Sequence, residues 1–116
     1  MPKNKVDPLT AQASKAFLQK LEGHFNISKA ILFGSRARLD YTDESDADIA
    51  LLISDEVGQF VDTKLQLDDY AYEVLLDTGI RIQPIPIWQD EWVHPEHYPN
   101  PALIFNIQKE GIPLEF

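Results

Sequence analysis

The segment from Gly34 to Asp48 constrains the fold more than any other part of the 116-residue chain. A short apolar run, Ala30-Ile31-Leu32-Phe33, is followed by Gly34-Ser35, and after ten intervening residues Asp46-Ala47-Asp48 opens a second apolar run. Short apolar runs that are bounded by turn residues are typical of buried strands. Residues two apart on a strand point to the same face, so the two aspartates are expected to lie side by side.

The residues of this segment have the chemistry needed to hold a phosphate and a metal ion. Glycine lets the backbone at Gly34 approach a phosphate closely, and N–H groups at a helix start form an anion site together with the Ser35 hydroxyl. Arg36 and Arg38 follow directly, and their planar guanidinium groups can pair with phosphate. Asp46 and Asp48 repel each other unless one is protonated or a cation binds them. Mg²⁺ prefers one or two carboxylates plus phosphate oxygens and water, so the pair predicts a magnesium site.

Each of these elements also has a simpler structural interpretation. Gly-Ser is a common turn, in which Ser35 can serve only as a helix cap. Arg36 and Arg38 can form surface ion pairs with carboxylates such as Asp40, and such pairs contribute little to stability. Asp-x-Asp at a strand start can be a solvated loop end. The combination of strand, Gly-Ser, Arg and Asp-x-Asp is what favours a phosphate and metal site.

The rest of the chain alternates between helical and extended patterns. Helices are predicted from residues 7–8 to Gly23, at 35–38, at 60–78 and from Asn100-Pro101 to Gly111, and strands at 29–33, 46–53 and 80–87. Residues 40–45, 54–58 and 88–99 are expected to be loops or turns. Pro84 and Pro86 place the third strand at an edge of the sheet or shorten it. The order α, β, short α, β, α, β, α predicts an α/β (α+β) fold with a small mixed sheet flanked by helices.

Length and composition predict a single domain that spans residues 1–116. Hydrophobic residues make up 44% of the chain and charged residues 25%, which is ordinary for a globular protein. No apolar run is long enough to cross a membrane, and the first residues lack the apolar segment of a signal peptide. The chain has no cysteine, which excludes disulfides and thiolate metal sites. A cytoplasmic location is therefore expected.

The net charge of −9 bears on the kind of partner that the chain can bind. A strongly acidic surface repels a phosphate backbone, so direct binding of nucleic acid is not expected. An acidic surface suits a basic protein partner, and it also favours solubility without any partner.

The motif and its surroundings resemble a known family. Gly34-Ser35, ten further residues and Asp46-Ala47-Asp48 match the signature of the DNA polymerase β-like nucleotidyltransferases. The longer strings Leu32-Phe33-Gly34-Ser35-Arg36-Ala37-Arg38 and Ser45-Asp46-Ala47-Asp48-Ile49-Ala50-Leu51-Leu52 resemble the minimal nucleotidyltransferases (the MNT family), bacterial and archaeal single domains of about this length. Residues 73–116 are similar to the C-terminal half of one bacterial subgroup.

The resemblance implies transfer of AMP from ATP onto a hydroxyl, with release of pyrophosphate. It implies that Gly34 and Ser35 hold the triphosphate, and that Asp46 and Asp48 bind Mg²⁺ and are the catalytic residues. Minimal members are commonly encoded beside a HEPN-domain protein, often a ribonuclease toxin, and act as its antitoxin by adenylylating a tyrosine. The resemblance therefore implies a HEPN toxin as partner, in a hetero-oligomer.

One departure from the family pattern concerns the third strand. The superfamily usually has a third carboxylate there, whereas this chain offers Gln83 or Arg81. A neutral amide can coordinate Mg²⁺ but cannot serve as a general base. An alternative is therefore an antitoxin that is catalytically weak or inactive and neutralises its partner by binding. Transfer to RNA or an antibiotic is disfavoured, because the chain has neither a basic stripe nor a second domain to hold such an acceptor.

Residues 88–99 hold two further features. His94-Pro95-Glu96-His97 has the composition of a metal site, but a loop that packs through aromatic and proline contacts is the better interpretation. Trp88 and Trp92 suit either core packing, adenine stacking or a partner interface, where tryptophan is enriched.

Overall fold

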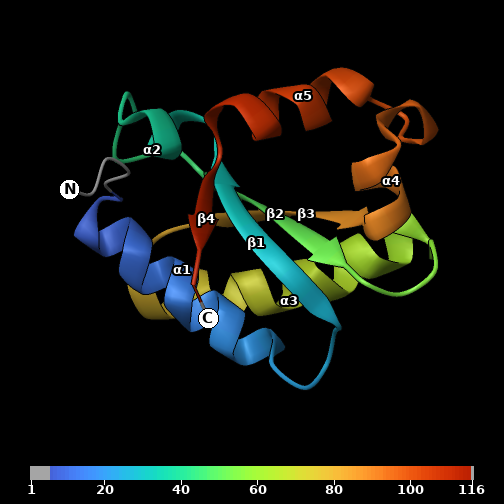
Figure 1. The fold of residues 1–116 in the computed structure, drawn as a ribbon. Coiled ribbons are helices and arrows are strands. Elements are labelled where there is room, and N and C mark those ends of the chain that lie inside the picture. Colours follow the sequence, from blue (N-terminus) through green and yellow to red (C-terminus); the bar gives the residue numbers. More distant parts are fainter. Residues whose placement is uncertain (1–5, 116) are drawn as a thin grey trace.

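The computed structural model describes residues 6–115, which form a four-stranded sheet with helices on both faces (Figure 1). The elements are, in order, α1 (Pro8–Leu21), β1 (Ile27–Phe33), α2 (Ser35–Arg38), β2 (Ala47–Ile53), α3 (Phe60–Thr78), β3 (Ile82–Trp88), α4 (Gln89–Val93), a 3₁₀ turn (Pro95–His97), α5 (Pro101–Glu110) and β4 (Ile112–Leu114). The predicted α/β class with a small mixed sheet is confirmed.

The sheet has the strand order β3-β2-β1-β4. β1 runs antiparallel to both β2 and β4, and β2 runs parallel to β3. β3 therefore lies at one edge, as its two prolines predict. The Ala47 N–H donates to the Arg81 carbonyl at 2.9 Å, so odd-numbered residues of β3 direct their backbone groups toward β2. Pro84 and Pro86 direct their nitrogens to the outer edge, where no ladder hydrogen bond is lost.

One face of the sheet packs against α1 and α3. Successive strand residues point to opposite faces, and on this face Leu32, Ile49 and Leu51 are fully buried against Phe17 of α1 and Leu67 of α3. Helical spacing supplies the facing residues, because Ala13, Phe17 and Leu21 recur every four positions along α1.

The other face packs against α5 and the segment that precedes it. Ile31, Ala50 and Leu52 form a second apolar cluster there with Ile104 and Ile107 of α5. In Figure 1, α5 lies on one side of the sheet while α1 and α3 lie on the other. Asp48 is two residues from Ala50 on β2, and Gln83 is two residues from Ile85 on β3, so each shares a face with a member of the second cluster. Their side chains therefore emerge on the face that α5 covers.

The predicted helix boundaries are largely confirmed by the capping contacts. The Asp7 carboxylate accepts from the Thr10 N–H at 3.0 Å and begins α1. Gly79 ends α3 with φ 81°. The expectation that Ser35 caps the second helix is wrong, because Gly34 is the N-cap and Ser35 is the first helical residue.

The prediction that residues 88–99 form a loop is wrong in part, because this segment contains the short helix α4 and a 3₁₀ turn. The Trp88 N–H donates to the buried Glu91 side chain at 3.1 Å, which stabilises the first turn of α4. Trp88 is buried and Trp92 packs partly buried against the second cluster, in agreement with core packing.

Two strands begin later than predicted, since β2 begins at Ala47 and β3 at Ile82.

β4 is the strand that sequence patterns did not predict. Its three residues pair with the outer edge of β1, with Ile112 opposite Leu32 and Leu114 opposite Ala30. This pairing returns the chain to the end of β1, directly after α5. The C-terminal segment thereby reaches the neighbourhood of Gly34.

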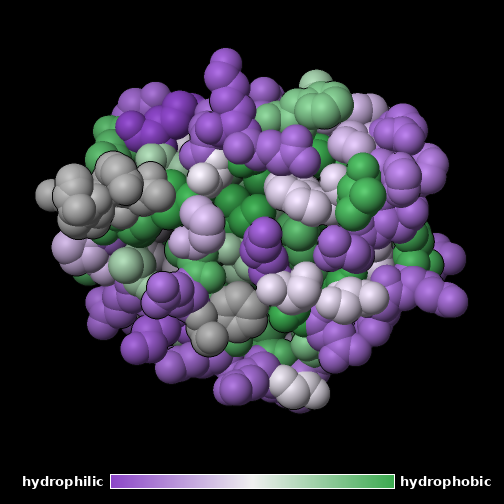
Figure 2. All heavy atoms as spheres, in the orientation of Figure 1, coloured by the Kyte–Doolittle hydropathy of each residue, from purple (hydrophilic) through white to green (hydrophobic). Residues whose placement is uncertain are grey.

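Within the described residues no helix has the length and apolar character to span a membrane. Figure 2 shows hydrophilic side chains over most of one face of the molecule, with hydrophobic patches between them.

Candidate functional site

Gly34 and Asp48, from the two halves of the motif, lie in contact. Gly34 joins β1 to α2 with φ 79°, a conformation that residues with a side chain rarely adopt. A Cβ atom built at Gly34 would collide with the Asp48 carboxylate. Glycine is therefore required here both by the turn and by the space that the carboxylate occupies.

Asp48 is the central residue of the site. It lies in β2 between Phe33 of β1 and Gln83 of β3, which are its Cα partners on the two sides. Burial raises the pKa of the Asp48 carboxyl to about 6, and the neighbouring Asp46 charge adds to the rise. No side-chain hydrogen bond or ion pair joins this carboxylate to another described residue. Asp48 is thus a half-buried acid whose charge is offset only in part, by the nearby Arg38.

Asp46 and Ser35 adjoin the two contacting residues along the chain, and both are half-buried. Asp46 immediately precedes β2, and its Oδ1 is 3.7 Å from the Arg81 Nε, in an ion pair open to solvent. Ser35 is half-buried at the start of α2, next to Gly34. The structure therefore brings Gly34, Ser35, Asp46 and Asp48 to one end of the sheet, and their binding and catalytic roles stay predictions.

Arg36 has a different setting from the one expected for a phosphate ligand. Its side chain is buried, the Nη1 atom donates to the Thr10 hydroxyl at 2.8 Å, and the Nε atom donates to the Ser45 carbonyl at 3.0 Å. The guanidinium also stacks 4.5 Å from the centre of the Tyr41 ring. Arg36 thus connects α1, α2 and the loop before β2. Its predicted contact with nucleotide would have to coexist with these internal contacts.

Arg38 and Glu110 form the part of the site that sequence reasoning did not identify as a unit. Glu110, the last residue of α5, accepts from the Gly34 N–H at 3.0 Å and from the Arg38 Nη1 at 3.1 Å. Its negative charge also raises the pKa of Asp48. An acidic residue in the last turn of a helix opposes the helix dipole, and this was the one sequence signal that could have indicated a role for Glu110.

Gln83 of β3 lies beside Asp48, where the family resemblance leads one to expect a third carboxylate. Of the two residues considered from sequence, Gln83 is the one that pairs with Asp48 in the parallel ladder. Its Oε1 accepts from the Lys64 Nζ at 3.1 Å, and the same Nζ lies 2.6 Å from Asp68 Oδ1. The amide oxygen is therefore engaged by α3 and adds no negative charge to the site.

The acidic pair fits a divalent cation by its chemistry. Two carboxylates at one edge, one of them with a raised pKa, are the ligands that Mg²⁺ takes when phosphate oxygens and water complete its shell. Within residues 6–115 no group of three or more His, Asp or Glu side chains is arranged to hold a metal ion. Any Mg²⁺ here would accordingly depend on the substrate for part of its coordination.

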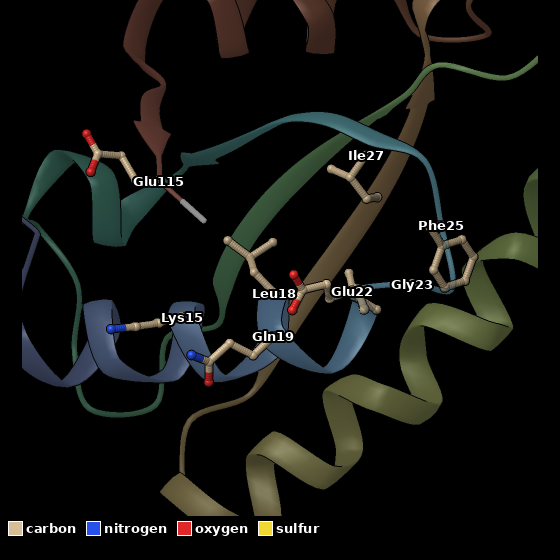
Figure 3. A pocket seen from close by; sticks show the side chains of 9 residues that line it. Lys15, Leu18, Gln19, Glu22, Gly23, Phe25, Ile27 and Glu115 are labelled. Atoms are coloured by element: carbon tan, nitrogen blue, oxygen red, sulfur yellow. The ribbon is translucent and has the colours of Figure 1, made fainter.

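A cavity of about 480 Å³ opens elsewhere, at the other end of β1. Lys15, Gln19 and Glu22 of the α1 segment line it together with Phe25 and Glu115 (Figure 3). It contains none of the motif residues, which lie at the end of β1 and around the start of β2.

Comparisons with known proteins show similarity in sequence and in fold. A protein of Methanocaldococcus jannaschii that is provisionally named a protein adenylyltransferase is 43% identical over 76 residues, which cover 64% of this chain and 69% of that protein. A crystal structure from Sulfolobus solfataricus, provisionally named a nucleotidyltransferase, has the same fold with a TM-score of 0.58 at 20% identity. That match covers 80% of this chain and 85% of the other.

The family assignment rests on a match along most of the chain. The sequence profile described as Polymerase beta, Nucleotidyltransferase covers residues 15–114, which include the whole sheet and every motif residue. Together with the contact between Gly34 and Asp48, this match means that the chain belongs to the polymerase beta nucleotidyltransferase family.

Proposed function

We propose that this protein is a Mg²⁺-dependent adenylyltransferase that transfers AMP from ATP to a hydroxyl group of a protein partner. The observation that carries the proposal is the contact between Gly34 and the Asp48 carboxylate. A triphosphate held at Gly34 and Ser35 would lie directly against the acidic pair. The provisional name of the M. jannaschii relative supports AMP as the transferred group and a protein as the acceptor.

In the proposed reaction the acceptor hydroxyl oxygen attacks the α-phosphorus of ATP. A new P–O bond forms while the bond from the α-phosphorus to the pyrophosphate oxygen breaks, and pyrophosphate leaves with that electron pair. Asp46 and Asp48 would hold Mg²⁺, which when bound neutralises charge on the phosphates. The Gln83 amide cannot accept the hydroxyl proton. Asp48 or a group of the partner would take it.

The proposed partner is a HEPN-domain toxin, whose tyrosine would receive AMP, with this protein as the antitoxin. Support for a protein partner comes from α3, which exposes Val61, Leu65, Tyr72 and Leu76. Their spacing of four, seven and four residues places them in one stripe on the helix. Acidic residues of α3 border the stripe, so its complement is an apolar surface with basic residues around it.

The transfer reaction is tested with radiolabelled ATP, Mg²⁺ and the proposed HEPN-domain partner. The wild-type protein is expected to label the partner, and Asp46→Asn with Asp48→Asn is expected to abolish labelling. Asp55→Asn is the matched control, because Asp55 is exposed beyond the far end of β2 and an asparagine oxygen can still accept from Asn26. Equal labelling by the double variant and the control would refute the catalytic proposal.

The role of α3 is tested with a double substitution on the exposed stripe. Leu65→Glu with Leu76→Glu is expected to weaken the complex with the same partner at least tenfold, since two exposed apolar contacts would become charged. Binding of ATP should be unchanged. Leu9→Glu, an equally exposed leucine on α1, is the control. Unchanged affinity for the partner would place the interface elsewhere.

A second candidate function follows from Gln83, whose oxygen is held by Lys64. Without a third carboxylate, the protein would neutralise its partner by binding alone. In that case the complex on size-exclusion chromatography survives the double aspartate substitution, and no label is transferred. Labelling by the wild-type protein would reject this candidate.

A further inference from the structure

The Glu110 carboxylate accepts hydrogen bonds from two donors, the Gly34 N–H and Arg38, that a nucleotide phosphate at this site would also bind. One carboxylate oxygen, Oε2, accepts from the backbone N–H of Gly34 at 3.0 Å and from Nη1 of Arg38 at 3.1 Å. The second oxygen, Oε1, is 3.3 Å from the same Nη1. The carboxylate thus bridges the turn and the arginine with charge-assisted hydrogen bonds.

The backbone around Glu110 fixes this contact. Gly111 follows it, and a Cβ built at Gly111 would collide with the Ile107 carbonyl oxygen and with the Ile31 side chain. Ile112 then pairs with Leu32, two residues before Gly34. The glycine turn and the β4 pairing therefore hold the end of α5 against the end of β1. The Glu110 side chain retains 27% of its solvent exposure, so it contacts solvent as well as Gly34 and Arg38.

The contact concentrates negative charge that the site has few cations to balance. The charges of Asp46 and Glu110 both lie near the Asp48 carboxylate, and Arg38, the cation nearby, is bonded to Glu110. A phosphate oxygen and a carboxylate oxygen accept the same kind of hydrogen bond from an N–H and a guanidinium. The Gly34 backbone offers a single N–H, so a phosphate oxygen that accepts from it must displace the Glu110 carboxylate, and repulsion between the two anions disfavours sharing Arg38 as well.

We propose that Glu110 is an intramolecular competitor for the nucleotide phosphate, and that its carboxylate leaves Gly34 N–H and Arg38 when ATP binds. The inference rests on the proposed function, since it takes Gly34 as a phosphate contact. Glu110 would then set the affinity for ATP and keep the site closed to weaker anions. The opposite role, in which Glu110 helps to hold the metal, predicts the opposite change in affinity.

The test measures binding of Mg²⁺·ATP and of Mg²⁺·tripolyphosphate by isothermal titration calorimetry. Glu110→Gln keeps the size of the side chain but removes its charge, and both ligands are expected to bind about tenfold more tightly. Glu56→Gln is the control for net charge, because Glu56 is an exposed glutamate in the turn after β2. Circular dichroism on each variant verifies that the fold is intact.

A second variant separates the effect of the Glu110 hydrogen bonds from the effect of its charge. Glu110→Asp keeps the net charge but shortens the side chain by one methylene, so it is expected to tighten binding as Glu110→Gln does, although less. Unchanged or weaker binding in Glu110→Gln overturns the proposal, and weaker binding would point to a metal-holding role. An equal gain in Glu56→Gln would overturn it as well, because the effect would then be one of overall charge.

The outcome is distinguishable from failure of the proposed function. Tighter binding by Glu110→Gln without AMP transfer to any partner would support the competitor and reject the transferase. AMP transfer by the wild-type protein without tighter binding by the variant would reject only the competitor. Binding of neither ligand by any form would reject both.

Discussion

At the scale of single residues, Gly34 is the position where one added methyl group has two separable costs. The left-handed conformation, with φ 79°, strains any residue with a side chain, and the new Cβ would also collide with Asp48. We expect Gly34→Ala to lower the free energy of unfolding by about 2–4 kcal/mol. Urea denaturation followed by circular dichroism measures the change.

Gly23 provides the matched control for this substitution. Its φ is 84°, and a Cβ there would have no neighbour within 4 Å. Gly23→Ala should therefore show the conformational cost alone, about 1 kcal/mol. Equal losses in the two variants would mean that Asp48 moves away freely and that the contact does not constrain the site.

Asp48 gives the protein a pH dependence with a defined sign. Its pKa is about 6 in the folded state against 3.8 for an ordinary aspartate, so between these values the folded state binds more protons than the unfolded state. The Asp48 contribution to stability is thus favourable at low pH and is lost as pH rises from about 4 to about 6. We expect Asp48→Asn to be more stable than wild type by about 1–3 kcal/mol at pH 7.5, with the difference vanishing near pH 4.

The measurement is urea denaturation at both pH values in buffer that contains EDTA, because a bound cation would remove the charge conflict. Asp55→Asn, at an exposed position, should show a much smaller difference. A stability gain for Asp48→Asn that is the same at pH 4 and pH 7.5 would contradict the assignment of the effect to Asp48 ionisation.

At the scale of elements, α3 carries apolar residues on two sides with very different roles. Leu67 is fully buried between the sheet and α1, whereas Leu65 on the same helix is 59% exposed. Leu67→Ala is expected to lower the free energy of unfolding by about 2–5 kcal/mol, because it leaves a cavity in the core. Leu65→Ala should change it by no more than about 0.5 kcal/mol.

Chemical denaturation of the two leucine variants compares them directly. Both substitutions remove the same atoms from the same helix, so helix propensity cancels in the comparison. Similar losses would show that the exposed face of α3 is covered in solution, for instance by self-association, which sedimentation would then detect.

The elements that could be predicted from sequence are those with local signals. α1 has its Asp7 cap and four-residue spacing, and α3 ends at Gly79 in the conformation that glycine favours. β4 has three residues and a proline, which is too short for a periodic pattern, and it forms because the edge of β1 is available. Such an element depends on contacts that are distant in sequence.

The residues of the candidate site also divide into those that a local motif identifies and those that depend on contacts distant in sequence. Gly34, Ser35, Asp46 and Asp48 lie within one segment, so a short motif could identify them. The hydrogen bond between Glu110 and Gly34 joins residues 76 positions apart in the sequence. The buried Arg36 side chain donates to Thr10, which is 26 positions away. Neither contact has a sequence pattern of its own. The side-chain environment of an arginine or a glutamate is set by the tertiary structure, and only the structure reveals it.

At the scale of the whole molecule, the net charge of −9 opposes the compact state through self-repulsion. The surface ion pairs, such as Lys20 with Glu73 and Arg38 with Asp40, are open to solvent and offset little of it. We expect stability to rise by about 1 kcal/mol between about 10 mM and about 300 mM NaCl, since salt screens the repulsion. Urea denaturation midpoints at the two salt concentrations measure the change, and a fall in stability would contradict this balance.

The prolines of β3 limit how this molecule can associate. Pro84 and Pro86 turn two nitrogens without hydrogen toward the free side of the sheet, and β4 covers the other side by pairing with β1. A further strand could not form a regular ladder along β3. Recognition by strand addition, and growth of the sheet into an aggregate, are both obstructed at β3. Any protein that docks at this edge must use side chains, and its specificity then depends on their shape and charge.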